Sequence, residues 1–409
     1  MKYAVVTFGC RVNQADSIAI ERDLCARGAV AARPDEADFV IVNTCSVTAG
    51  ADQGARQTIR RIARSNPGVR MIVTGCYATR RPRELAELPN VARVVRNSAK
   101  DALVDLIADD IGLPTPERSA DGDGPCGSAL GPGLGGRTAF TLRVQTGCDE
   151  RCSYCIIPST RGSGRSKPMP QVVADVERAV SAGYKEIVLT GVHLGSYGRD
   201  LDEPTSLLDL VSTFAHWPAD VLFRISSLEP MDCTPEIVEI AAESPRIAPH
   251  FHLPLQHGDD RMLQAMRRPY TASFYQRLID RIHSTLPHAS IGSDVIVGFP
   301  GETDIQFEEM RRFLEDVPLS HLHVFPYSDR PGTVASALGG KVEGAVIRAR
   351  GAVVRAIGER MIRRFRQSQC GTTRRALTVD DGMTAVTDNY VKVRLDVRHP
   401  RNEWIEVKL

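Results

Sequence analysis

Three features are missing from this 409-residue sequence, and each absence excludes a class of protein. No apolar run reaches the length of about eighteen residues that a membrane-spanning helix needs, so no membrane segment is predicted. The first residues, MKYAVVTFGC, carry no signal-peptide pattern, so we expect a cytoplasmic protein. The formal net charge is only +1, which excludes a globally basic nucleic-acid binder but is compatible with a local basic patch.

The sequence does contain ten cysteines, which in the reducing cytosol are more often metal-binding or catalytic than disulfide-bonded. Cys148, Cys152 and Cys155 lie in the string GCDERCSYC and offer three thiolates within one loop. A structural zinc site and an ordinary iron–sulfur cluster both use four protein ligands, whereas three thiolates on a four-iron cluster leave one iron open for a small molecule. The alternative is a zinc loop whose fourth ligand lies elsewhere, at His252 or His257.

The first hundred residues alternate between strand and helix patterns. The β-branched runs YAVVTF, DFVIVN and VRMIVT are separated by helical stretches over residues 14–27 and 51–65, which predicts an open parallel α/β sheet with helices on both faces. Cys10, Cys45 and Cys76 each follow one of these strands. Because ligands bind at the carboxyl ends of strands in such sheets, we expect the three thiols to converge there as a second cluster site. The alternative is that they are buried filler residues.

A linker and a second α/β unit come next. Residues 114–137 are rich in Gly and Pro, which predicts a flexible linker. Residues 138–337 contain six strand candidates with helical patterns between them: TLRVQT, EIVLTG, VLFRIS, HFHLPL, SDVIVGF and HLHVFPY. Six βα repeats predict a partial (β/α)6 barrel, with the Cys148 loop on the face where such folds build active sites. The remaining cysteines stand alone and are interpreted as incidental: Cys25, Cys126, Cys233 and Cys370.

The C-terminal part combines a basic helix with short strands. Residues 341–375 carry ten Lys or Arg and two Asp or Glu, and helical periodicity predicts one apolar face made by Val346, Val353, Ile357, Met361 and Phe365. The arginines form either a solvated helix face or a stripe that contacts RNA phosphates. The strands RALTVDDG, MTAVTDNYVKVRLDV and NEWIEVKL predict a small antiparallel β-barrel, a fold that commonly binds oligonucleotides.

These motifs together resemble the methylthiotransferases, a family of radical S-adenosylmethionine (SAM) enzymes. TFGCRVNQADS, NTCSVT and VTGCYA are similar to that family's cluster-binding domain, and GCDERCSYCIIPSTRG, with Tyr154 before the last cysteine, is similar to its SAM-cluster loop. SLEP, HLPLQHGDDRMLQAMRRPYT, DVIVGFPGET and FPYSDRPGT extend the resemblance through the core, and the final strands resemble a short TRAM domain. The implied domains are a cluster-binding domain (1–113), the linker (114–137), a radical SAM core (138–370) and a TRAM-like β domain (371–409).

The resemblance implies two [4Fe-4S] clusters and SAM as cofactors. Cys148, Cys152 and Cys155 would hold the cluster whose open iron binds SAM, which yields a radical able to remove hydrogen from an unactivated C–H bond. The other triad would hold a second cluster whose open iron presents the sulfur for insertion: Cys10, Cys45 and Cys76. A second SAM would supply the methyl group.

SAM contacts are predicted by position along the core. Tyr154 adjoins the cluster loop, and Gly191 follows the second strand, where a missing side chain lets the backbone approach a ligand. Gln256 and Asp294 are assigned to the ends of later strands and are predicted to bind the ribose or the amino group. The alternative is that these residues make ordinary hydrogen bonds of the barrel. Two neighbouring histidines are interpreted as local structure, not acid–base groups: His193 and His257.

The predicted substrate is N6-threonylcarbamoyladenosine beside the anticodon of tRNA, at position 37, methylthiolated at C2. LTGVHLGSYG and CRVNQADS resemble the branch of the family that acts on this base, and a base in a single-stranded loop can be splayed into a pocket. The alternatives are isopentenyladenosine in tRNA, an aspartate of a ribosomal protein, or a non-catalytic, metal-stabilised RNA-binding protein. The predicted partners are the tRNA anticodon loop, an electron donor such as a flavodoxin or ferredoxin, and a sulfur donor.

Overall fold

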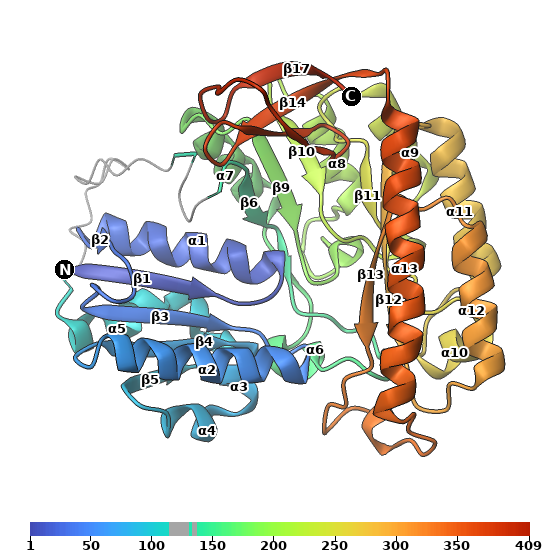
Figure 1. Ribbon diagram of the computed structural model, residues 1–409. Helices are drawn as coiled ribbons and strands as arrows, with labels where there is room; N and C mark the ends of the chain where they lie inside the picture. The colour runs from blue at the N-terminus through green and yellow to red at the C-terminus, as the bar shows by residue number, and fades with distance from the viewer. Residues whose placement is uncertain (114–130, 133–136) are drawn as a thin grey trace.

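The computed structural model describes residues 1–113, 131–132 and 137–409. An N-terminal α/β unit lies beside a larger β/α unit, and a small β-sheet covers one end of the larger unit (Figure 1). The predicted linker falls almost wholly outside the described residues, as does Cys126. Among the described helices, none is both long and apolar enough to cross a membrane.

The N-terminal unit is a five-stranded parallel sheet of order β2-β1-β3-β4-β5. Alternate residues of β3 belong to two separate cores: Ile41 packs with the helices on one face, whereas Val40 packs with those on the other. The predicted open sheet with two covered faces is therefore confirmed. Its elements are β1 (Lys2–Thr7), α1 (Arg11–Ala26), β2 (Val30–Ala31), β3 (Phe39–Thr44), α2 (Ala49–Ser65), β4 (Arg70–Gly75), α3 (Cys76–Arg80), α4 (Pro82–Ala86), β5 (Val91–Val95) and α5 (Leu103–Ile111).

The central unit is the predicted six-stranded partial barrel. Its parallel strands form two sheets, β10-β9-β6 and β11-β12-β13, and single bridges such as Ser227 to His252 connect them. The strands are β6 (Phe140–Arg143), β9 (Glu186–Thr190), β10 (Leu222–Ile225), β11 (His250–His252), β12 (Ser290–Val297) and β13 (His321–Pro326). The helices between them are α7 (Met169–Ser181), α8 (Leu207–Ala215), α9 (Pro235–Glu243), α10 (Asp260–Ala265), α11 (Ala272–Thr285) and α12 (Asp304–Asp316).

The two faces of the barrel strands differ in polarity. Ile291 and Val295 of β12 belong to the apolar core beneath the helices, so Gly292 and Asp294 face the opposite side, the barrel interior. The same alternation turns Arg224 of β10 inward. Closed (β/α)8 barrels fill this space with branched apolar side chains. A polar interior indicates that this one receives a polar molecule.

The C-terminal segment begins with α13 (Gly344–Gln369), which packs along β13, and continues into a four-stranded antiparallel sheet. The predicted antiparallel strands are confirmed, but they form an open sheet with β16 and β17 at its edges instead of the predicted barrel. Its strands are β14 (Thr373–Val379), β15 (Thr384–Thr387), β16 (Lys392–Arg394) and β17 (Trp404–Lys408).

The predicted apolar face of α13 is wrong at one position. Val353 is exposed, and its neighbour Val354 is fully buried instead. The buried stripe also contains Gly351 and Gly358, and a Cβ on Gly358 would lie 3.3 Å from the Cβ of Leu322 in β13. A pattern based on large apolar residues does not include glycine, and here a glycine of α13 forms the close contact with β13.

Candidate active site

The three-cysteine loop lies between β7 (Gln145–Thr146) and α6 (Ile157–Arg161), just beyond the carboxyl end of β6. Gly147 begins it with φ +73°, and a Cβ there would lie 1.9 Å from the carbonyl oxygen of Ser163. Only glycine fits this approach. The backbone N–H of Cys155 donates to the carbonyl of Cys152 at 3.1 Å, which tightens the loop.

A buried arginine contacts this loop from another part of the barrel. Arg268, which follows α10, donates to the sulfur of Cys152 at 3.0 Å and pairs with Glu229, which follows β10. Burial raises the pKa of Cys152 and raises that of Cys155 to about 12. Metal binding must therefore displace protons from these thiols, as it does for cysteine ligands in general. SLEP and MRRPYT contain Glu229 and Arg268, but sequence reasoning gave neither residue a role.

The N-terminal cysteines follow three adjacent strands: Cys10 follows β1, Cys45 follows β3, and Cys76 follows β4. Gly9 has φ +93°, and a Cβ there would lie 2.7 Å from the sulfur of Cys45. Gly75 has φ +102°, and its Cβ would lie 2.2 Å from the carbonyl oxygen of Thr44. Burial raises the pKa of Cys45 to about 11, and the nearby thiols of the other two cysteines contribute. The structure thus brings these three thiols to one sheet edge.

The sulfur spacing argues against mononuclear zinc at either triad. Among the described residues, the only group of three or more His, Cys, Asp or Glu side chains with ligand atoms within 4.8 Å of one another is His252, Asp294 and His323. A tetrahedral zinc with Zn–S bonds of about 2.3 Å holds its sulfurs roughly 3.8 Å apart. Wider thiol triads match a multi-iron cluster in which each thiolate binds a different iron.

The histidines considered as fourth zinc ligands are engaged elsewhere. His252 Nε2 lies 2.9 Å from Asp294 Oδ1. His257 is fully buried, where its Nδ1 accepts a hydrogen bond from the backbone of Asp259 at 3.0 Å and its Nε2 lies 3.5 Å from Glu302. His257 therefore has the local structural role predicted for it.

Helix α6 connects the cysteine loop to the N-terminal unit. Arg161, at the end of α6, pairs with Asp16 of α1 at 3.1 Å. Asp16 also pairs with Lys100 at 2.9 Å and with Arg143 at 2.5 Å. Although burial opposes ionisation, these three cations hold the pKa of Asp16 well below its usual range.

Two carboxylates face these three cations, since Arg143 also pairs with the exposed Asp101 at 2.7 Å. The thiols of Cys76 and Cys10 help to raise the pKa of Arg161, although burial of the guanidinium opposes this. Asn97 donates to the carbonyl of Thr160 in α6 at 2.9 Å and lies 3.6 Å from the sulfur of Cys76. Asn97 and Arg161 therefore link the two units beside the N-terminal thiols.

The predicted SAM contacts lie around the cysteine loop, and their roles stay predictions. At Gly191 a Cβ would lie 3.0 Å from Gln145 Oε1, which accepts the next two backbone N–H groups. Gln256 has φ +70°, and its N–H donates to the carbonyl of Asp294 at 2.8 Å. Tyr154 is partly buried against an apolar cluster that includes Met262, Met266 and Phe299.

His193 also lies at the cysteine loop. Its Nε2 lies 2.7 Å from Asp232, and its Nδ1 lies 4.0 Å from the sulfur of Cys148. Although burial opposes the charge, Asp232 and the Cys148 sulfur raise the pKa of His193 to about 10. Three other described cysteines belong to neither triad and are free thiols, and their incidental role stays a prediction: Cys25, Cys233 and Cys370.

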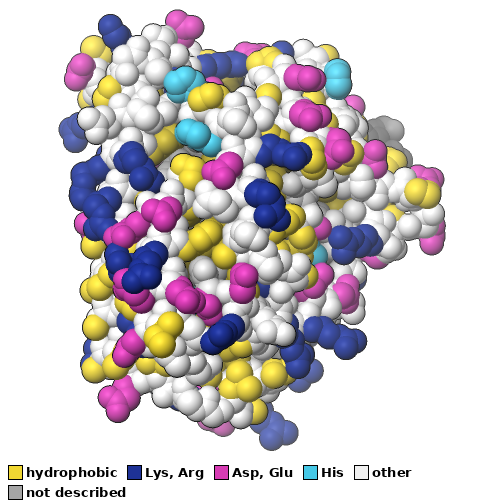
Figure 2. All heavy atoms as spheres, turned by 90° about the vertical axis from the view of Figure 1, so that its right-hand side faces the viewer, with side chains coloured by type: hydrophobic (Ala, Val, Ile, Leu, Met, Phe, Trp, Pro, Cys, Tyr) yellow, Lys and Arg dark blue, Asp and Glu magenta, His cyan; other side chains and the backbone are white. Residues whose placement is uncertain are grey.

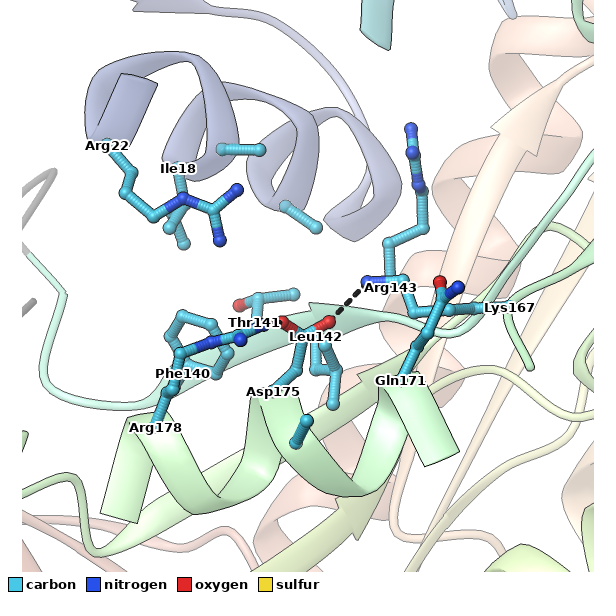
Figure 3. A pocket seen from close by; sticks show the side chains of 13 residues that line it. Ile18, Arg22, Phe140, Thr141, Leu142, Arg143, Lys167, Gln171, Asp175 and Arg178 are labelled. Carbon is cyan, nitrogen blue, oxygen red and sulfur yellow. Dashed lines mark hydrogen bonds and ion pairs between the residues drawn. The ribbon is translucent and has the colours of Figure 1, made fainter. Parts of the chain in front are cut away.

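A cavity of about 340 Å³ lies between α1, β6 and α7, away from the predicted site residues. Figure 3 shows its basic lining, to which Arg22, Arg143, Lys167 and Arg178 contribute. Asp175 accepts from both Lys167 and Arg178, so part of this positive charge is already paired. None of the cysteines lines this cavity.

Comparison with known proteins agrees with this arrangement. The model of the Radical SAM superfamily matches residues 142–314, and that of uncharacterized protein family UPF0004 matches residues 2–96. The threonylcarbamoyladenosine tRNA methylthiotransferase MtaB of Aquifex aeolicus is 35% identical over 407 residues, 96% of each chain. The chain belongs to the radical SAM methylthiotransferases. Radical SAM membership implies SAM and a [4Fe-4S] cluster as cofactors.

Other relatives show how broad this methylthiotransferase family is. A tRNA-2-methylthio-N(6)-dimethylallyladenosine synthase of Roseiflexus is also 35% identical, but the match spans 82% of this chain and 70% of that protein. Among solved structures, the radical SAM methyltransferase TsrM of Kitasatospora setae matches with a TM-score of 0.57 at 16% identity, covering 82% of this chain and 76% of that one. That likeness supports the fold alone.

Proposed function

We propose that this methylthiotransferase acts on tRNA, where it adds sulfur and a methyl group at C2 of N6-threonylcarbamoyladenosine, beside the anticodon. The observation that carries the proposal is the extent of the match. The MtaB proteins of Aquifex aeolicus and Bacillus subtilis align with 96% and 95% of this chain, whereas the dimethylallyladenosine synthase of Roseiflexus aligns with 82% at equal identity. Identity alone does not separate the two branches, but coverage favours the first.

The residues fit the two cofactor roles that this function requires. Cys148, Cys152 and Cys155 would hold the cluster that binds SAM, and bound SAM supplies the radical needed to break an unactivated C–H bond. Around it, Arg268 and Glu229 orient the loop, and Tyr154, Gly191, Gln256 and Asp294 are the proposed contacts of SAM. The three thiols at the sheet edge would hold the second cluster: Cys10, Cys45 and Cys76.

An exposed arginine surface supports RNA as the substrate. Arg355, Arg363 and Arg366 of α13 are exposed and make no side-chain hydrogen bond or ion pair with the described residues. Lys and Arg side chains gather along one edge of the molecule where α13 runs (Figure 2). Because α13 packs on β13, an edge strand of the partial barrel, this surface borders the barrel opening. Unpaired arginines there suit contact with phosphates.

Two other arginines predicted to join this surface are already engaged. Arg360 pairs with Glu315 at 3.1 Å, and Arg364 lies 3.5 Å from the carbonyl of Val317. The RNA contact proposed here for α13 therefore rests on Arg355, Arg363 and Arg366. The four-stranded sheet after α13 is the proposed TRAM-like domain.

Mass spectrometry of tRNA nucleosides tests the proposal. Cells that lack the gene should accumulate N6-threonylcarbamoyladenosine and lose its 2-methylthio derivative, and the wild-type gene should restore it. Loss of 2-methylthio-isopentenyladenosine, or of a methylthio-aspartate in a ribosomal protein, would instead support one of the alternatives. The electron donor, the sulfur donor and the cytoplasmic location stay predictions.

Metal content separates the enzyme from a zinc-stabilised RNA-binding protein. Anaerobically purified protein with two four-iron clusters contains about eight irons per chain and a matching amount of sulfide. One or two zincs without sulfide would contradict the enzymatic function.

A further inference from the structure

The barrel interior contains a second group of reactive side chains, separate from the cysteines. Asp294 Oδ1 lies 2.9 Å from His252 Nε2 and 3.1 Å from His323 Nδ1. The three residues, called here the histidine–aspartate group, come from the neighbouring strands β11, β12 and β13, and Asp294 is directly opposite His323 in the strand register. The side chain of His323 is 58% exposed, so a ligand that enters the interior can reach it.

A glycine makes space for this arrangement. A Cβ at Gly292 would lie 2.9 Å from His252 Nδ1 and 2.0 Å from His321 Nε2. The rings of His252 and His323 have centroids 5.3 Å apart. Because Gly292 has no side chain, imidazole rings fill the space beside it on the face of β12 that lines the barrel interior.

The histidine–aspartate group lies close to the cysteine loop. Arg268, which contacts Cys152, also donates to the hydroxyl of Tyr270 at 3.1 Å. That hydroxyl donates to the carbonyl of Pro254 at 2.8 Å, and two residues later the N–H of Gln256 donates to the carbonyl of Asp294. A short series of hydrogen bonds therefore connects the loop to the strands that carry the group.

The group presents donors for an anion. Each imidazole uses one nitrogen on Asp294, which leaves His252 Nδ1 and His323 Nε2 for a ligand. The hydrogen bond and charge of Asp294 raise the pKa of His323, whereas burial and the neighbouring rings lower that of His321 to about 4. Positive charge is therefore favoured on His323 and disfavoured on His321.

We propose that His252 and His323, held by Asp294 as a positioning residue, bind the carboxylate of the threonylcarbamoyl substituent and so select this adenosine over those with an apolar N6 substituent. The inference rests on the proposed function and names the substrate feature that the interior recognises. An isopentenyl group offers no partner for these donors. A site that hydrogen-bonds a polar substituent discriminates against an analogue that lacks it.

The test compares two anticodon stem-loop RNAs that differ at one group. One carries N6-threonylcarbamoyladenosine, and the other carries the same base with the carboxylate replaced by a neutral carboxamide. Affinities of both are measured for the SAM-bound, cluster-loaded enzyme. Because a hydrogen bond to a charged group contributes more than one to a neutral group, the wild type should prefer the carboxylate RNA by roughly ten- to hundredfold.

His323→Gln should reduce this preference to less than about threefold and leave the affinity for the carboxamide RNA unchanged. His252→Gln should act in the same direction. Arg355→Gln, outside the interior, is the matched control and should weaken the binding of both RNAs by the same factor. Iron content of each variant verifies that the clusters are intact.

The outcomes separate this inference from the proposed function. If the wild type does not methylthiolate the threonylcarbamoyladenosine RNA, the proposed function is wrong. If it does, and both histidine variants with full iron content keep the wild-type preference, only the present inference is overturned. It is overturned as well if the protein holds a zinc or manganese ion that His323→Gln removes, since the histidines would then be metal ligands.

Discussion

The two cysteine triads differ in how the chain builds them. Cys148, Cys152 and Cys155 span eight residues of one loop, whereas the N-terminal thiols span residues 10–76 and follow three separate strands. The loop is shaped by Gly147 and by Arg268 from outside it. The N-terminal triad exists only when the whole parallel sheet has formed. A local motif can therefore be recognised from spacing, while a dispersed one depends on the stability of its domain.

The largest expected effects separate the tasks of the two triads. Cys148→Ala should abolish reductive SAM cleavage, measured as formation of 5′-deoxyadenosine, because its loop is proposed to hold the SAM-binding cluster. Cys45→Ala should keep cleavage but eliminate the methylthiolated nucleoside. Cys25 belongs to neither triad, so Cys25→Ala is the control and should retain both activities. Loss of cleavage in a Cys45→Ala protein whose loop cluster is intact would show that the triads do not work separately.

The interface between the triads should be sensitive to the loss of one buried carboxylate. Asp16→Asn leaves Lys100 and Arg161 buried without their anion, which should cost about 3–5 kcal/mol of unfolding free energy. The control is Asp101→Asn: Asp101 is an exposed partner of Arg143, and its loss should cost about 0.5 kcal/mol or less. Thermal unfolding of both variants measures the difference.

The direction of the Asp16 pKa shift determines how the stability difference between wild type and Asp16→Asn depends on pH. Asp16 has a lowered pKa in the folded protein, so its contribution is fully present above the unfolded value of about 4 and is lost as pH falls toward the folded value. The gap between wild type and Asp16→Asn should therefore be constant from about pH 6 to pH 8. A gap that changes across this range would show that another group controls the interface.

Glycine substitutions sharpen the contrast between a dispersed and a local site. Gly75→Ala places a methyl group against the backbone of Thr44 at a positive φ, which should destabilise the N-terminal unit by roughly 2–4 kcal/mol and release its cluster. Gly68→Ala is the matched control, since no atom lies within 4 Å of its Cβ. Iron content and thermal unfolding should change in the first variant only. Equal iron content and equal thermal unfolding of the two variants would show that the strand-end glycines do not shape this triad.

The smallest effect concerns a surface that belongs to neither triad. Replacing Arg355, Arg363 and Arg366 with Gln should reduce the slope of log affinity for tRNA against log salt by roughly 0.7 to 0.9 for each lost phosphate contact. SAM cleavage without RNA should be unchanged. Arg360→Gln, which removes an arginine already paired with Glu315, should change the slope less. Identical slopes for all variants would mean that α13 presents only a solvated face.

Sequence reasoning identified features that are local or periodic. The cysteine spacing, the parallel sheet and the six barrel strands were predicted because each is encoded in a short stretch of chain. Glu229 and Arg268 were missed because their meaning arises only where the end of β10 meets the segment after α10. The pairing of His323 with Asp294 depends on the register of β12 and β13, which no single sequence reveals. The face of α13 was misplaced by one residue because glycines form its contact.

The position of Asp16 has a consequence for the order in which the protein is assembled. The ribosome makes the chain from its N-terminus, and domains generally fold as units in that order. Of the three cations that surround Asp16, Lys100 belongs to the first unit, but Arg143 and Arg161 are synthesised 127 and 145 residues after it. The first unit is therefore made with its Asp16–Lys100 pair in place, and the carboxylate gains its two arginine partners only after the chain of the barrel has been synthesised.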